Sequence, residues 1–235
     1  MSSLVLTPEL LEEAHTAAEY LQWVRTLISR VKEAPDGLEQ IRLRKGLAKE
    51  LMNEALPIGL LASTYFGGSE QVSISLKIGN QSYDATVSDC RKNGSSVNHV
   101  EVTLASDGDN DYLRMLALHQ TGEVSGLGSV KKSGTRRTGL TIRVEREMAS
   151  HAEVLRQESD RLSHAIVRKL DKTYPRNTLL LIGMDDTMAF DRPDNVANLK
   201  ATVETCLPRL RGFHSVAVVG LQQGMLLSWD TKSAI

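Results

Sequence analysis

The clearest pattern of hydrophobic and polar positions in this chain lies at residues 72–105, where apolar and polar residues alternate in three short runs. Gly-Asn at 79–80 and Asn-Gly-Ser-Ser at 93–96 separate the runs. Side chains of a strand alternate between its two faces, so this spacing is typical of strands joined by tight turns. The pattern predicts a meander of three antiparallel strands.

Two acidic residues lie inside the second and third runs. Asp84 points away from its neighbour Ala85, and Glu101 points away from Val100 and Val102, if both runs are extended. When these runs form neighbouring strands, the two carboxylates can share one face of the sheet. Carboxylates placed in this way repel each other unless they are protonated or bind a cation.

An amphipathic helix is predicted before the meander, over residues 10–31. Thr7 and Pro8 suit the start of a helix, and Ala-Pro-Asp-Gly at 34–37 ends it. Apolar residues recur at spacings of four and three along this segment. The stripe they form either packs on the rest of the domain or forms a seam with a second copy or another protein.

A second helix is predicted over residues 38–56, ending before Pro57. Glu54 shares its apolar face with Leu51 and Ile58. A carboxylate at such a position costs free energy unless something compensates it. Glu54 therefore reaches a polar site, accepts backbone donors, or extends from the helix end into solvent.

The second half of the chain alternates between helical and extended patterns. Asp185 and Asp186 follow a short apolar strand and are expected to form a turn or a cap, although sheet proteins often place functional groups there. The predicted elements are helices at 111–119, 150–172 and 193–210 and strands at 177–184, 214–220 and 225–229. The fold class is α/β (α+β), with a mixed central sheet flanked by helices. The expected domains are an N-terminal helical arm at 1–37 and an α/β domain at 38–235.

A Gly- and Ser-rich insertion at about 121–148 carries a cluster of basic residues. Its spacing lacks the second glycine of a phosphate-binding loop, so a hairpin is the preferred interpretation. The tip of the hairpin either contacts a nucleic-acid backbone or is a mobile solvated loop. The basic residues expected to bind there are Lys131, Lys132, Arg136 and Arg137.

Composition excludes some classes of function. The net charge of the 235 residues is -1, so binding to nucleic acid would need a local basic patch, and the 4% of aromatic residues argues against a platform of stacked rings. No apolar run approaches the ~18 residues of a membrane span. Cys90 and Cys206 lie far apart, and the first residues do not resemble a secretion signal. We expect a cytoplasmic protein with reduced thiols.

Glu54 before the meander, Asp84 in its second strand and Glu101-Val102-Thr103 in its third give residues 38–220 a resemblance to the restriction-endonuclease-like, PD-(D/E)xK nuclease superfamily. The resemblance implies that Asp84 and Glu101 hold Mg²⁺ or Mn²⁺, with Glu54 as a further ligand. The lysine of the motif, which positions the attacking water, is replaced by Thr103. In this superfamily the cation can move to another element. The candidates are Lys169, Lys172 and Lys77, with Gln120 as an uncharged alternative.

Three functions follow from these observations. The first is metal-dependent hydrolysis of DNA or RNA phosphodiesters, with Asp84, Glu101, Thr103 and Lys169 as catalytic residues. The second is a nuclease-like fold without chemistry that binds nucleic acid or a protein partner through the hairpin and the N-terminal helix. In the third, Asp84 and Glu101 are ordinary polar residues of a protein with an unrelated function.

Overall fold

The computed structural model describes residues 6–124, 128–135, 139–145, 147–187 and 192–231. The helical elements are α1 (Pro8–Leu11), α2 (Tyr20–Glu33), α3 (Gly37–Leu43), α4 (Ala48–Glu50), the π-helical turn η1 (Leu51–Ala55), α5 (Leu56–Thr64), α6 (Asp109–Thr121), α7 (His151–Val167), α8 (Arg192–Cys206) and the 3-10 turn η2 (Leu207–Arg209). The strands are β1 (His15–Thr16), β2 (Val72–Leu76), β3 (Ala85–Asp89), β4 (His99–Ala105), β5 (Val130–Thr135), β6 (Gly139–Val144), β7 (Thr178–Met184), β8 (Ser215–Gly220) and β9 (Leu226–Asp230).

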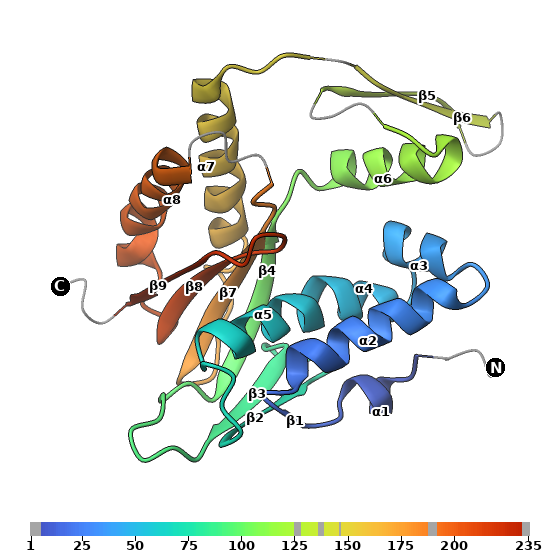
Figure 1. Ribbon diagram of the computed structural model, residues 1–235. Helices are drawn as coiled ribbons and strands as arrows, with labels where there is room; N and C mark the ends of the chain where they lie inside the picture. The colour runs from blue at the N-terminus through green and yellow to red at the C-terminus, as the bar shows by residue number, and fades with distance from the viewer. Residues whose placement is uncertain (1–5, 125–127, 136–138, 146, 188–191, 232–235) are drawn as a thin grey trace.

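A seven-stranded sheet of order β1-β2-β3-β4-β7-β8-β9 forms the centre of the molecule (Figure 1). Strands β2, β3 and β4 are the predicted antiparallel meander, whereas β4, β7 and β8 run parallel. Each parallel connection passes through a helix, α7 and then α8, as a crossover requires. The mixed α/β class predicted from the sequence is confirmed.

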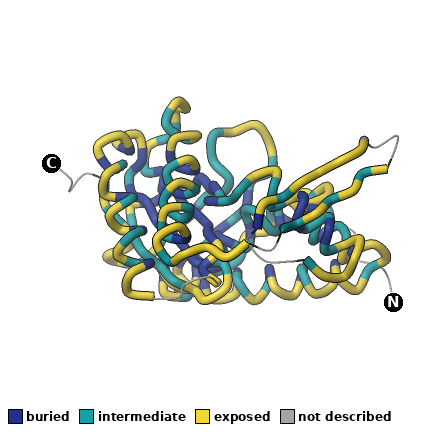
Figure 2. Tube along the Cα trace, turned by 90° about the horizontal axis from the view of Figure 1, so that it is seen from above, coloured by how far each residue is buried: buried dark blue, intermediate teal, exposed yellow. Residues whose placement is uncertain are grey.

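Helices cover both faces of this sheet and create two apolar cores. Val100, Val102 and Leu179 pack with α2 and α5 on one face, while Leu180 and Ile182 pack with α7 and α8 on the other. Every residue of β7 is buried, as expected for a central strand covered on both sides. Figure 2 shows the buried chain between layers of exposed helix surface.

The predicted helix over residues 10–31 is divided in the structure. Helix α1 ends at Leu11, and β1 pairs with β2 before α2 begins. The division is stabilised by long-range hydrogen bonds, because Glu12 accepts from the Ile78 amide (2.7 Å) and from the Ser75 hydroxyl (2.7 Å). The apolar stripe of α2 then packs in the same core as α5 and the sheet.

The helix predicted over residues 38–56 is wrong in two respects. It is interrupted after α3, where Arg44 takes a left-handed conformation (φ 53°), and α4 begins only at Ala48. Its second part does not end before Pro57 but continues to Thr64. Its π-helical turn, η1, ends at Ala55, two residues before the proline, and the Leu56 amide donates a hydrogen bond to the carbonyl of Leu51. A proline removes one backbone donor and crowds the preceding turn, and the wider π turn accommodates both effects. Glu54 lies in this turn.

The remaining predicted elements are present, with ends that differ by a few residues. The basic insertion forms the separate hairpin of β5 and β6, which packs on α6 beyond the carboxyl end of β4 (Figure 1). Helix α7 ends at Val167, before the predicted limit of 172. Among the helices that the structure describes, none is long and apolar enough to cross a bilayer.

Candidate carboxylate–lysine site

Asp84 and Glu101 come together where β3 begins. The β3–β4 ladder pairs Ala85 with Val100, and Asp84 directly precedes it. The Asp84 amide donates to the Val100 carbonyl (2.8 Å), and its carboxylate Oδ2 accepts from the Val102 amide (2.7 Å). Burial, followed by the negative charge of Glu101, raises the pKa of Asp84 to about 6. The two acids therefore interact, as the sequence predicted.

The positive charge at this site comes from the end of α7. Lys169 Nζ lies 2.5 Å from Glu101 Oε1, and Glu101 is only 4% exposed. Beside this pair, Arg168 Nη2 donates to the Leu104 carbonyl (2.9 Å) and lies 3.4 Å from Thr103 Oγ1. Lys169 thus supplies, from the turn that follows α7, the ammonium that Thr103 cannot supply from the strand.

Glu54 approaches the same acids from the η1 turn, which packs on β4. Burial raises its pKa to about 8, and the charge of Asp84 is the next cause. The positive charge of Lys169 acts on Glu54 in the opposite direction. Glu54, Asp84 and Lys169 are therefore close enough to influence one another, and Glu54 is mostly protonated at neutral pH.

Two tyrosine hydroxyl groups next to these acids were not predicted from the sequence. Burial raises the pKa of Tyr174, as do the charges of Glu101 and Asp84, and its buried hydroxyl has no hydrogen-bond partner. Burial, followed by the charge of Glu54, raises the pKa of Tyr20, whose buried hydroxyl also has no hydrogen-bond partner. In the sequence, Tyr174 stands out only as part of a Tyr-Pro pair that ends a helix, because nothing local shows that these acids influence it.

The donor set of this site suits a hard divalent cation, because it consists of carboxylate oxygens. Among the described residues, no group of three or more His, Cys, Asp or Glu side chains is arranged to hold a metal ion. Mg²⁺ commonly takes only one or two protein carboxylates and completes its shell with water and substrate phosphates. Asp84 and Glu101 fit that requirement. The charge of Glu101 contributes to the raised pKa of Asp84, and a bound cation would relieve this repulsion between the two carboxylates.

Other predicted residues lie outside this cluster. The backbone amide of Lys77 donates to the Asp84 carbonyl (2.8 Å), and no acid of the cluster pairs with its ammonium in the described structure. Gln120 is exposed on α6. His99, which could have added a nitrogen ligand, packs its ring on Tyr83 with centroids 4.6 Å apart, and its buried Nδ1 has no partner.

Of the predicted nucleic-acid-binding residues, the two that the structure describes, Lys131 and Lys132, are also separate from the acids. Lys131 pairs with Glu145 (2.8 Å), and Lys132 is exposed on the hairpin. Arg136 and Arg137 lie outside the described residues. The structure thus places the basic hairpin against α6 and not beside Asp84 and Glu101.

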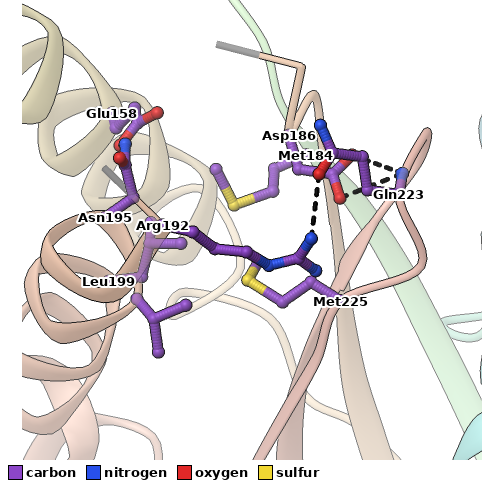
Figure 3. A pocket seen from close by; sticks show the side chains of 9 residues that line it. Glu158, Met184, Asp186, Arg192, Asn195, Leu199, Gln223 and Met225 are labelled. Atoms are coloured by element: carbon purple, nitrogen blue, oxygen red, sulfur yellow. Dashed lines mark hydrogen bonds between the residues drawn. The ribbon is translucent and has the colours of Figure 1, made fainter. Parts of the chain in front are cut away.

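A second polar region lies past the carboxyl end of β7. Asp185 accepts from the Thr187 amide and forms a local turn, as expected. Asp186 instead accepts from the amides of Gln222 and Gln223 in the distant β8–β9 turn. A shallow hollow opens beside Asp186, lined by residues of α8, the end of β7 and the β8–β9 turn, with Glu158 of α7 at its edge (Figure 3). Arg192 crosses it to reach Gln223 Oε1 (2.9 Å). Because Glu101 pairs with Leu180 near the start of β7, this hollow is not part of the carboxylate–lysine site.

Comparisons with protein-family models, with curated proteins and with solved structures find no match to this chain.

Proposed function

We propose that this protein is a metal-dependent phosphodiesterase that acts on nucleic acid. The observation that carries the proposal is the buried contact between Lys169 and Glu101 beside Asp84. The order of helix, three-stranded meander, helix and parallel strand supports it, because this is the order in which the restriction-endonuclease-like resemblance places its acids. Glu54, from the helix before the meander, joins them electrostatically.

Asp84 and Glu101 would hold Mg²⁺ or Mn²⁺, with Glu54 as a further carboxylate nearby. Such a bound ion lowers the pKa of a coordinated water and neutralises charge on the phosphate. Val102 fixes the orientation of Asp84 through its amide, so one carboxylate oxygen is held and the other is free to bind. The side chain of Glu101 is buried and bonded to Lys169, which limits its rotation.

Lys169 would orient the attacking water and stabilise the negative charge that develops on phosphorus oxygens. A preorganised cation in a water-poor site is effective because it does not have to reorient during the reaction. Its ammonium is already fixed by Glu101, and the charge of Lys169 also reaches Asp84. Thr103, next to Arg168, can add only a neutral hydroxyl.

A binding module without chemistry is the second candidate function. It is favoured by the absence, among the described residues, of a three-ligand group of metal-binding side chains. In that case the Lys169–Glu101 pair would be purely structural, and the hairpin would bind nucleic acid or a protein partner.

Cleavage assays distinguish these functions. Purified protein is incubated with plasmid, linear duplex DNA, single-stranded DNA and RNA, with Mg²⁺, Mn²⁺ or EDTA. We expect cleavage of at least one substrate with metal, and its loss in Asp84→Asn and Glu101→Gln. Asp109→Asn is the control, because Asp109 is an exposed acid on α6. Cleavage that persists in both site variants would contradict the proposal.

A further inference from the structure

The segment that joins α7 to β7, residues 168–176, is strongly basic; we call it the α7–β7 turn. It holds four cationic residues and one acid, Asp171. The cations are Arg168, Lys169, Lys172 and Arg176. The chain as a whole has a net charge of -1, so this is a local concentration of positive charge.

Three of these cations are available to a ligand. Arg168, Lys172 and Arg176 are exposed, and none of them forms an ion pair with a residue that the structure describes. The helix dipole favours cations in the last turn of α7, which accounts for Arg168. This effect decays within one turn, so it does not account for Lys172 and Arg176, which follow the end of the helix at Val167.

The α7–β7 turn lies against the carboxylates. Lys169 contacts Glu101, and Arg168 reaches Thr103 and Leu104 on β4. The positive charge of Lys172 helps to lower the pKa of Asp84. The charges of both acids also raise the pKa of Tyr174, from the same turn, whose buried hydroxyl has no hydrogen-bond partner in the described structure. One segment therefore supplies both the cation at the site and exposed cations around it.

The basic hairpin cannot replace the turn at this position. The hairpin is connected to the start of α7 (Figure 1), whereas Lys169 follows the end of that helix. Helix α7 has 17 residues, so its two ends are about 25 Å apart. A phosphate at Asp84 and Glu101 therefore needs a nearer source of positive charge, because the acids themselves repel it.

We propose that a nucleic-acid strand runs along the α7–β7 turn, with its phosphates contacting Arg168, Lys172 and Arg176. This places a phosphodiester beside Asp84 and Glu101. The identification of the polyanion as nucleic acid rests on the proposed function. The contacts go to phosphates and carry no base recognition, so binding is independent of sequence and weakens steeply with salt.

The test is the binding of fluorescein-labelled single-stranded DNA, duplex DNA and RNA in EDTA, where no cleavage occurs, measured by anisotropy across a salt series. The variant Lys172→Gln/Arg176→Gln removes two exposed charges whose side chains form no hydrogen bond or ion pair with the residues that the structure describes. The matched control, Lys200→Gln/Arg211→Gln, removes two exposed charges on and after α8. We expect the turn variant to bind about tenfold more weakly, with a salt slope smaller by about 2, and the control to match wild type.

Equal losses in the two variants, an unchanged salt slope, or no binding by wild type would overturn the inference. Its failure is distinguishable from failure of the proposed function. Cleavage by a protein whose turn variant binds normally would remove only the inference. Turn-dependent binding without metal-dependent cleavage would support the inference and remove only the enzymatic function.

Discussion

Lys169 Nζ lies 2.5 Å from Glu101 Oε1, and this contact joins the turn after α7 to β4 across 68 positions of sequence. Both side chains are largely withdrawn from solvent, so each charge depends on the other. Removing one partner of a buried ion pair leaves an uncompensated charge, which is far more costly than removing both.

Replacing Lys169 should therefore destabilise the fold through Glu101. We expect Lys169→Met to lower the free energy of unfolding by about 3–5 kcal/mol, measured by urea denaturation. The double variant Glu101→Gln/Lys169→Met should recover much of this loss, since no charge is left unpaired. Strictly additive effects of the two single changes would show that the ion pair is not formed in solution.

Glu54 should make the stability of the metal-free protein depend on pH. Its pKa rises from 4.5 to about 8 on folding, so the folded protein keeps a proton that the unfolded chain loses. Stability therefore falls as pH rises from about 4.5 to 8. Glu54→Gln removes this penalty. Above pH 8 it should raise the free energy of unfolding by on the order of 2 kcal/mol, which corresponds to a Tm higher by roughly 4–8 °C, and at pH 4 it should give no gain.

The control for this change is Glu33→Gln, which removes an exposed acid from α2. Its Tm should follow that of wild type at every pH. A gain for Glu54→Gln that is as large at pH 4 as at pH 8.5 would contradict the buried, protonated state of Glu54.

Metal binding should also depend on pH. Asp84, with its pKa of about 6, and Glu54, with its pKa of about 8, must lose protons before their oxygens can bind a cation. The apparent affinity for Mn²⁺, measured by calorimetry, should rise between pH 6 and 8 and become flat above that range. Asp84→Asn should abolish most of the heat, whereas Asp109→Asn should retain it. A pH-independent affinity in wild type would place the ion elsewhere.

Much of the fold could be predicted because its determinants are local. Alternation along β2, β3 and β4 gives strands with defined faces, and these faces place Asp84 and Glu101 together. The uninterrupted apolar run of β7 marks a strand that is buried on both sides. These patterns need no information about distant segments.

The remaining features depend on contacts between distant residues. The break after α1 is stabilised by hydrogen bonds that Glu12 accepts from Ser75 and Ile78, and the helix continues through Pro57 because of a π turn. The sequence offered Lys77, Lys169 and Lys172 as cations, and only the path of α7 over β4 selects Lys169. The α7–β7 turn was likewise hidden, because its position beside the acids is a property of the assembled sheet.

The rate of Mg²⁺-dependent nucleic-acid cleavage by Lys169→Gln, relative to wild type and to Lys77→Gln, tests the central claim most directly. Both variants remove one lysine near the meander, but only Lys169 contacts a carboxylate of the site. The account predicts a rate about 10²–10³-fold lower for Lys169→Gln and an unchanged rate for Lys77→Gln. Equal rates for wild type and a folded Lys169→Gln protein would contradict it.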